Sequence, residues 1–240
     1  MCAHRKTRSS EPSRTRPLRL RLRSRVWALV LCALAGPLLG NGGPDLSADQ
    51  LVQAVQERYD GIKDITARFE QASQVASIGR TEQSRGSVTI KRPGRMRWEY
   101  SGPEPRVIAL DGTVLRMYLP EDEQLQIAPL GAGTFPPTAL DFLLGEGKLE
   151  TSFTAERIPE ERSGELGLLL RPKQDASFER LEIWVSAEGQ QLRESVVVDL
   201  FGNRTAVRFG AIRENAGVSD EIFRVEVPEG TDVIDLRTEP

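Results

Sequence analysis

The stretch KRPGRMRWEY at residues 91–100 decides the fold class of this chain. Its apolar residues Met96, Trp98 and Tyr100 alternate with charged residues, so the apolar side chains share one face of an extended strand. The Pro-Gly pair at positions 93–94 is typical of a tight turn. The pattern therefore predicts a strand with one buried and one solvated face, entered through a hairpin corner.

The same two-residue period continues on both sides of this strand. Alternating runs cover residues 65–69 and 86–90 before it, and two further runs flank Asp111-Gly112, a strong hairpin signal. Four more alternating runs follow, at residues 166–170, 181–185, 192–198 and 207–211. Clean alternation indicates antiparallel strands with one solvated face, and about eleven short strands are typical of a barrel or a sandwich. We expect a mainly β (α+β) fold in a single domain.

Two segments follow the helical period instead. Ser47-Ala48-Asp49-Gln50 is a capping box, and the apolar spacing after it predicts an amphipathic helix over about residues 47–61. A short second helix is expected at residues 139–144, which include Leu140 and Phe142.

The first forty residues have the pattern of a secretory leader. Residues 1–25 are rich in arginine, an apolar run covers residues 26–35, and the run ends in Ala33-Leu34-Ala35. These three features describe a signal peptide. We expect a signal peptide at residues 1–40, cleaved between about 35 and 46, and an exported domain at residues 41–240.

Two other interpretations of the leader are less favourable. A membrane anchor needs about 20 apolar residues, and Pro37 interrupts this run early. Lipidation would require a small residue before Cys32 at the end of the apolar run, but Leu31 precedes it and the run continues.

The charge of the chain is unevenly distributed. The sequence has 32 basic and 35 acidic residues, a net charge of −3. Nine of the basic residues and one acidic residue lie before position 26, which leaves 23 basic and 34 acidic residues and a net charge of −11. Nucleic-acid binding depends on basic side chains that neutralise phosphates, so we expect no nucleic-acid partner.

Histidine and cysteine occur only in the leader, as His4, Cys2 and Cys32. The exported chain therefore has no Ser-His-Asp or Cys-His catalysis, no imidazole or thiolate metal ligand and no disulfide. Carboxylate pairs remain, so a carboxylate-dependent hydrolase is one alternative function. The spacing of the acidic residues shows no catalytic constellation, metal site or cofactor motif. A non-catalytic structural β-domain is the other alternative.

Five motifs in order resemble the LolA family of periplasmic lipoprotein carriers. They cover about residues 46–236, nearly all of the exported chain. The motifs are YDGIKDITARFEQ, KRPGRMRWEY, DGTVLRMYLP, DLFGNRTAVRF and the ending FRVEVPEGTDVI.

The resemblance implies an incomplete antiparallel barrel of about eleven strands with a helical lid over an apolar cavity. It implies that Arg92 points toward the lid and hydrogen-bonds it closed, and that Met96 lies near the cavity mouth. The function implied is non-enzymatic binding of lipoprotein acyl chains, without cofactor or metal. The lipid-binding residues that we expect are Arg92, Met96, Trp98, Tyr100, Leu140 and Phe142.

The resemblance also implies a location and partners. A soluble monomer in the periplasm would carry acylated lipoproteins from the inner to the outer membrane. The donor would be the inner-membrane Lol ABC transporter complex. The acceptor would be LolB in the outer membrane, or the membrane directly.

Overall fold

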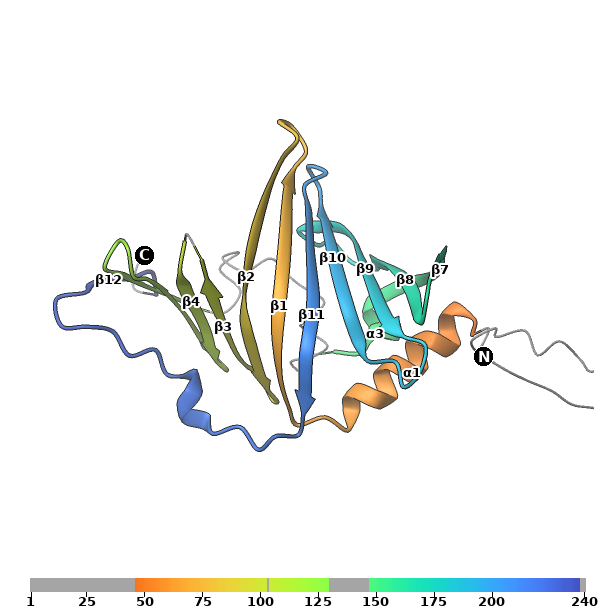
Figure 1. Cartoon of the computed structure of the whole chain (residues 1–240), viewed down its shortest axis with the longest axis horizontal. Helices are drawn as coiled ribbons and strands as arrows, with labels where there is room; N and C mark the ends of the chain where they lie inside the picture. The colour runs from red at the N-terminus through yellow and green to blue at the C-terminus, as the bar shows by residue number, and fades with distance from the viewer. Residues whose placement is uncertain (1–45, 103, 130–146, 238–240) are drawn as a thin grey trace, which may run out of the picture. The chain divides into compact units, whose positions relative to one another are not determined.

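Twelve strands form one continuous sheet in the computed structural model, which describes residues 46–102, 104–129 and 147–237 (Figure 1). In chain order the strands are β1 (Asp64–Val75), β2 (Arg80–Lys91), β3 (Arg95–Ser101), β4 (Arg106–Asp111), β5 (Val114–Leu119), β6 (Gln124–Pro129), β7 (Phe153–Arg162), β8 (Glu165–Pro172), β9 (Phe178–Ser186), β10 (Leu192–Asp199), β11 (Arg204–Glu214) and β12 (Asp232–Asp235). Their spatial order is β12-β6-β5-β4-β3-β2-β1-β11-β10-β9-β8-β7. Among the described strands β12 and β7 are the two edges, so the fold is an open, incomplete barrel, as the family resemblance implied.

Neighbouring strands are antiparallel throughout most of the sheet. The expected Asp111-Gly112 hairpin joins β4 to β5, and Gly112 has the φ of 104° that favours glycine. The exception is β12, which pairs in parallel with β6 and adds one strand to the eleven or so expected. Strand β12 has only four residues and no hairpin turn leads into it, so no sequence pattern predicted it.

Helix α1 (Ala48–Asp60) begins and ends within one residue of the predicted bounds. The Ser47 hydroxyl accepts the Gln50 N–H at 3.2 Å, and the Gln50 side chain accepts the Ser47 N–H at 2.9 Å. These two bonds form the expected capping box. The apolar side of the helix is buried through Leu51, Val52, Val55 and Tyr59.

Two further helical turns, α3 (Leu149–Ser152) and η1 (Asp220–Phe223), were not predicted from the sequence. Both have four residues, too few for a helical period to show. The helix predicted at residues 139–144, with Leu140 and Phe142, lies outside the described residues.

One face of the sheet, here called the inner face, shares its core with α1. The alternation within β1 shows how this face is made: Ile65, Ala67 and Phe69 are buried, whereas Arg68 and Glu70 point to the opposite, outer face. The other strands add to the same core Val88, Ile90, Met96, Trp98, Leu110, Leu168, Leu170, Leu181, Ile183, Val207 and Phe209. The described residues from 46 onward belong to one compact unit.

A buried carboxylate joins the start of β1 to the segment that follows β11. Asp64 is 5% exposed, and its carboxylate accepts the N–H groups of Ala216, Gly217 and Val218 at 2.6, 3.1 and 3.4 Å. The Asp64 carbonyl accepts the N–H of Asn215 at 2.8 Å. Since a carboxylate has acceptor sites for several donors, one side chain fixes the direction in which the chain leaves β11.

The segment between β11 and β12 then runs past the lower ends of the strands toward β12 (Figure 1), and it contacts outward-pointing side chains of β2 and β3. Lys91 and Arg95 bind the Asp220 carboxylate at 2.5 and 2.6 Å. Arg97 donates to the carbonyl groups on either side of Phe223, at 3.1 and 2.9 Å, and Phe223 is buried. These contacts bring the chain to the edge strand β6, beside which β12 lies.

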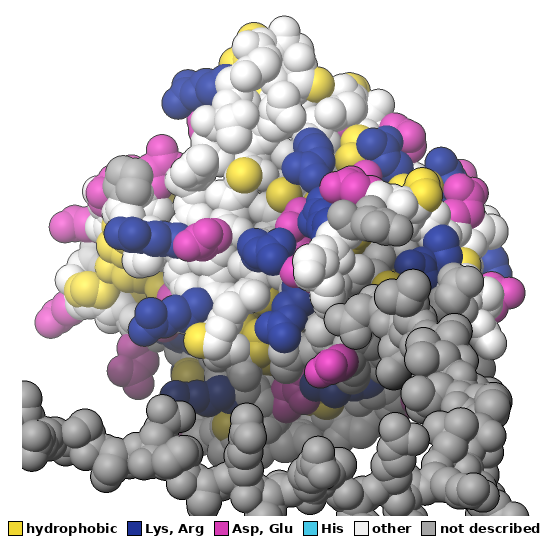
Figure 2. All heavy atoms as spheres, turned by 45° about the vertical axis from the view of Figure 1, so that its right-hand side comes forward, with side chains coloured by type: hydrophobic (Ala, Val, Ile, Leu, Met, Phe, Trp, Pro, Cys, Tyr) yellow, Lys and Arg dark blue, Asp and Glu magenta, His cyan; other side chains and the backbone are white. Residues whose placement is uncertain are grey.

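The surface in view in Figure 2 carries interspersed acidic and basic side chains. This part of the described surface therefore lacks the continuous basic region that binds nucleic acid. No helix of the described residues has the length and apolar character needed to cross a membrane.

Replacing Asp64 by alanine should destabilise the fold, because three backbone N–H groups lose the buried carboxylate that accepts them. We expect the free energy of unfolding to fall by about 2–4 kcal/mol, since hydrogen bonds to charged groups contribute about 1.5–3 kcal/mol each and water recovers part of the loss. Urea unfolding followed by circular dichroism measures this change. The exposed Asp122→Ala is the matched control and should unfold like the parent. Equal stability of the two variants would show that the Asp64 carboxylate is dispensable.

Candidate functional site

Strands β1, β3 and β11 bring aromatic side chains together on the inner face. Trp98 and Tyr100 come from β3, Phe69 from β1 and Phe209 from β11. The register explains their proximity, because Gly86 of β2 lies opposite both Phe69 and Tyr100, and β11 places Phe209 opposite Phe69. We call Phe69, Trp98, Tyr100 and Phe209 the aromatic cluster.

The Phe69 ring meets the rings of Trp98 and Tyr100 edge to face. The Phe69 centroid lies 4.5 Å from that of Trp98 and 5.0 Å from that of Tyr100, at interplanar angles of 64° and 75°. Trp98 lies 6.2 Å from Tyr100 and 6.3 Å from Phe209. Met96 Sδ accepts the Trp98 indole N–H at 2.9 Å. The aromatic cluster and Met96 therefore form a polarisable apolar region in which the Trp98 indole N–H has a hydrogen-bond acceptor.

Gly86 makes room for the aromatic cluster. A Cβ atom at this position would lie 2.9 Å from Cε1 of Phe69 and 1.9 Å from the carbonyl oxygen of Glu99. Glycine weakens a strand interior, so its presence in β2 is explained by the space that the Phe69 ring and the neighbouring backbone require.

Tyr100 forms a polar border of the aromatic cluster. Its hydroxyl donates to Gln71 Oε1 at 3.1 Å, and the Arg106 guanidinium lies 3.9 Å from the ring centroid. Burial raises the pKa of the Tyr100 phenol, and Arg106 opposes that shift. The phenol is therefore neutral at physiological pH and keeps its hydrogen to donate.

Arg92 lies in the turn between β2 and β3, beside the end of α1. Its backbone N–H donates to the Lys63 carbonyl at 2.8 Å. Burial lowers the pKa of the Arg92 guanidinium, and the neighbouring Asp60 and Tyr59 oppose that shift. Arginine remains protonated in proteins, so a half-buried cation stands next to the C-terminal turn of the helix.

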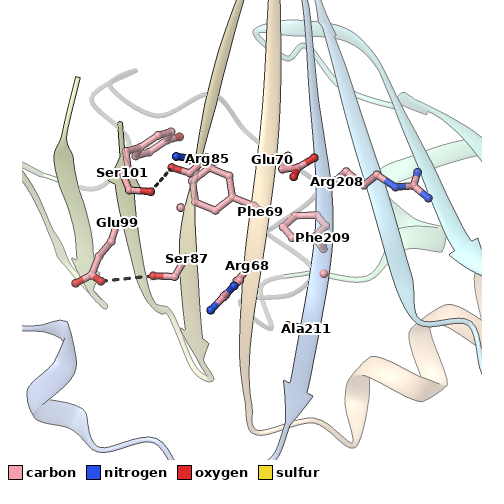
Figure 3. A pocket seen from close by; sticks show the side chains of 13 residues that line it. Arg68, Phe69, Glu70, Arg85, Ser87, Glu99, Ser101, Arg208, Phe209 and Ala211 are labelled. Atoms are coloured by element: carbon pink, nitrogen blue, oxygen red, sulfur yellow. Dashed lines mark hydrogen bonds between the residues drawn. The ribbon is translucent and has the colours of Figure 1, made fainter. Parts of the chain in front are cut away.

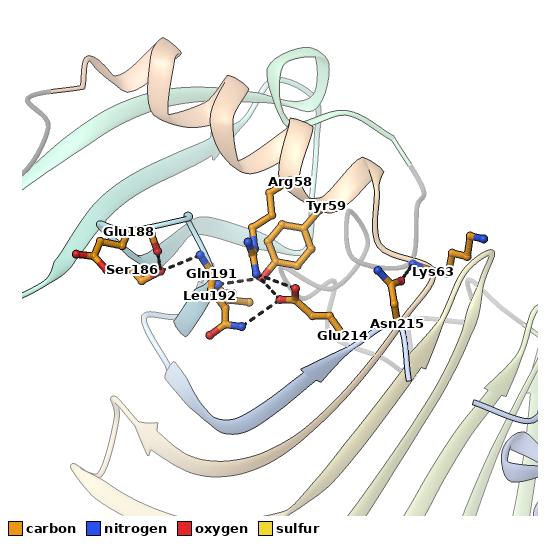
Figure 4. Close-up of polar contacts among 9 residues, drawn as sticks. All are labelled: Arg58, Tyr59, Lys63, Ser186, Glu188, Gln191, Leu192, Glu214 and Asn215. Carbon is orange, nitrogen blue, oxygen red and sulfur yellow. Dashed lines mark hydrogen bonds and ion pairs between the residues drawn. The ribbon is translucent and has the colours of Figure 1, made fainter. Parts of the chain in front are cut away.

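Two polar contacts fix α1 to the sheet (Figure 4). Arg58 Nη2 donates to both carboxylate oxygens of Glu214, at the end of β11, at 2.7 Å each. The Tyr59 hydroxyl accepts the Leu192 N–H of β10 at 2.9 Å. Burial raises the pKa of Tyr59, against the effect of the Leu192 hydrogen bond. The helix is thus attached to two strands near the centre of the sheet.

The outer face has a different character. An open groove of about 930 Å³ lies over β3, β2, β1 and β11, and Phe69, Tyr100 and Phe209 of the aromatic cluster are also among its lining residues (Figure 3). Arg208 in this groove binds Glu165 and Glu194 at 2.8 and 2.9 Å, and Ser87 donates to Glu99 at 3.4 Å. By strand alternation the outward side chains that line the groove are Arg68, Glu70, Arg85, Ser87, Glu99, Ser101 and Arg208. Since acyl chains gain nothing from charged groups, the inner face is the better candidate for binding lipid.

The described residues offer little for catalysis or metal binding. Asp64 is the one buried carboxylate among them, and it is engaged by three backbone N–H groups. Within the same residues, no group of three or more histidine, cysteine or acidic side chains is placed to hold a metal ion.

The sequence-predicted site residues fall into three groups. Met96, Trp98 and Tyr100 lie together on the inner face, as their spacing required. Arg92 lies apart from them, in the turn beside α1. Leu140 and Phe142 lie outside the described residues.

Three residues of the cluster region were not among the predicted site residues: Phe69, Gly86 and Phe209. Their alternation was visible in the sequence. The strand pairing that places them beside Trp98 and Tyr100 was not.

Comparison with known proteins identifies a family. The family model for the outer membrane lipoprotein carrier protein LolA matches residues 60–226. The outer-membrane lipoprotein carrier protein of Hahella chejuensis is 32% identical over 185 residues, which cover 76% of this chain and 87% of that protein. The protein of the same name from Cupriavidus pinatubonensis is 34% identical over 193 residues, with coverage of 78% and 87%.

Gly86→Ala should disrupt the aromatic cluster, because the new methyl group overlaps the Glu99 carbonyl and the Phe69 ring. We expect the free energy of unfolding to fall by about 2–3 kcal/mol or more, the upper range for overpacking. Gly210→Ala in β11 is the matched control, since a Cβ there meets nothing within 4 Å. Chemical denaturation compares the two. A Gly86→Ala protein as stable as Gly210→Ala would mean that the close approach at Gly86 does not constrain the fold.

Proposed function

Because the chain belongs to the LolA family of outer membrane lipoprotein carrier proteins, we propose that it is a chaperone that binds lipoprotein acyl chains and carries them to the outer membrane. The structural observation that carries the proposal is the aromatic cluster on the inner face of an unclosed sheet. An open sheet that keeps a broad apolar face next to a helix provides a surface that lipid can enter.

The physical need for such a carrier follows from the hydrophobic effect. Burial of a methylene group contributes about 0.8 kcal/mol, so one sixteen-carbon chain favours leaving water by roughly 12 kcal/mol. An acylated protein therefore does not cross an aqueous compartment unaided at a useful rate. A carrier needs an apolar surface and no nucleophile, in keeping with a non-enzymatic role.

We propose the periplasm as the location, reached after removal of residues 1–40. The cargo is acylated lipoprotein and the carrier is a monomer. The inner-membrane Lol ABC transporter complex is the proposed donor, and LolB or the outer membrane itself is the proposed acceptor. The leader and the names of the relatives support this placement.

Within this function, Arg92 is proposed to control closure of the site. Its half-buried guanidinium, with five N–H donors, stands beside the end of α1 and can hold several acceptors at once. An acyl chain that enters must break the hydrogen bonds between Arg92 and these acceptors. Their loss raises the free energy of the loaded state relative to the empty state. Release to an acceptor then restores the contacts and favours forward transfer.

The carrier function predicts saturable binding of a hydrophobic dye to the folded protein. Acylated lipoprotein should displace the dye, because both occupy the inner face, whereas the same lipoprotein without its acyl chains should not. Fluorescence titration measures both. Recovery of acylated protein with the carrier from the periplasm, by mass spectrometry, is the independent check. Absence of saturable dye binding would favour a structural β-domain with a filled core.

Arg92→Leu should load lipoprotein but hand it over slowly, and should accumulate as a loaded complex. The reason is that the closed empty state loses the contacts that favour release. The matched control is Arg95→Leu, three residues further along and paired with Asp220 on the outer face. Transfer from loaded carrier to acceptor, followed over time, gives the rates. If Arg92→Leu and the parent load and transfer equally, Arg92 has no role in closure.

A further inference from the structure

Three large apolar side chains project into water at one end of the central strands. Phe201 is 86% exposed, Ile78 68% and Leu200 65%. They lie in two turns, residues 76–79 between β1 and β2, and residues 200–203 between β10 and β11. The other strongly exposed large apolar side chains of the described residues all lie between positions 222 and 236.

The two turns lie side by side. Strands β1 and β11 pair as far as Gln74 and Arg204, so both turns leave the sheet at the same end (Figure 1). The Ala76 N–H donates to Asn203 Oδ1 at 3.0 Å and joins one turn to the other. We call the two turns together the apolar tip. It stands at the opposite end of β2 from the Arg92 turn.

The turn that carries Leu200 and Phe201 is held by its own hydrogen bonds. The Asp199 carboxylate accepts the N–H of Phe201 at 2.8 Å, the N–H of Asn203 at 2.9 Å and the Asn203 side-chain amide at 2.8 Å. The Gly202 N–H donates to the Asp199 carbonyl at 3.1 Å. Phe201 is therefore presented to solvent by an ordered turn.

These observations favour contact with lipid. We propose that the apolar tip inserts Ile78, Leu200 and Phe201 into the interfacial layer of a phospholipid bilayer. Exposed apolar clusters mark protein or membrane contacts, and aromatic rings favour the membrane interface. Backbone groups that enter lipid must be hydrogen-bonded within the protein, a condition that three successive N–H groups of the 200–203 turn meet. A narrow projecting tip can also enter a fluid lipid layer directly, because lipid offers no preformed pocket that the tip would have to match.

The charged side chains around the apolar tip are arranged for the same contact. Arg80 and Arg204 begin the strands that leave the tip, one step below the apolar side chains. Arg80 pairs with Glu82 at 3.2 Å, and Asp199 is engaged within its turn. Long basic side chains at this level reach anionic headgroups while the apolar groups above them enter lipid.

The biological purpose of the contact rests on the proposed carrier function, since a lipoprotein carrier must approach a bilayer to receive or release its cargo. The contact itself needs no cargo. It can therefore be tested on the empty protein, and its failure is separable from failure of the carrier function.

The experiment measures binding of the protein to vesicles of phosphatidylethanolamine and phosphatidylglycerol by flotation. Leu200→Ser combined with Phe201→Ser should lower the partition coefficient about tenfold or more, because two exposed apolar side chains no longer leave water. Val233→Ser combined with Ile234→Ser is the matched control, an adjacent apolar pair on β12 that is also exposed and should leave binding unchanged. All proteins are isolated in the same processed form, so their N-termini contribute equally.

A second variant reports on the turn itself. Tryptophan emission of the Phe201→Trp protein should shift to shorter wavelength when vesicles are added, relative to the same addition to the parent. The proposal would be overturned if vesicles shifted the emission of Phe201→Trp no more than that of the parent. Equal vesicle binding by the parent and the Leu200/Phe201 double variant would overturn it as well. A double variant that binds vesicles normally but fails in cargo transfer would mean that the apolar tip contacts a protein instead. Loading of lipoprotein, measured separately, should be unaffected by the double variant.

Discussion

The contact of Arg58 Nη2 with both carboxylate oxygens of Glu214 holds the helix that covers the apolar face of an open sheet. A closed barrel shields its apolar interior because the sheet closes on itself. This sheet has two edges among its described strands, so other elements must pack on its apolar face to shield it from water. The residue next to Glu214 extends the junction, because Asn215 Oδ1 accepts the Lys63 N–H at 2.7 Å. The Lys63 carbonyl in turn accepts the Arg92 N–H. The end of α1, the start of β1, the end of β11 and the β2–β3 turn therefore meet at one corner.

This corner contains Arg92, the residue proposed to control closure of the site. Its backbone N–H belongs to the same hydrogen-bonded junction that fixes the helix, and this position is the basis for its proposed role in closure. The far end of the same strands is built differently. There the sheet ends in two ordered turns with exposed apolar side chains, joined by the Ala76–Asn203 bond. One end thus restrains the cover, and the other is available for contact outside the molecule.

Much of this architecture could be predicted from local sequence, and the rest depends on pairing between distant segments. The capping box at Ser47 and the shared face of Met96, Trp98 and Tyr100 are consequences of spacing alone. Phe69 and Phe209 lie opposite each other only because β1 pairs with β11. These two residues are 140 positions apart, and no short-range pattern specifies their pairing. The strand β12 depends on the buried Asp64 and on Phe223, which guide the chain from β11 toward β6. Gly86 is likewise explained only when the ring of Phe69 is seen against it.

The aromatic cluster also bears on how tightly a carrier of this kind holds lipid. In the empty protein Phe69 already packs against Trp98 and Tyr100, so an acyl chain that enters must replace contacts of similar quality. The affinity is then the difference between the gain of roughly 12 kcal/mol for a chain that leaves water and the loss of the packing contacts that the chain displaces. An inner face with a large empty cavity would bind more tightly and release more slowly. An inner face whose side chains pack against one another in the empty protein favours reversible binding. Transfer between two membranes requires such reversibility.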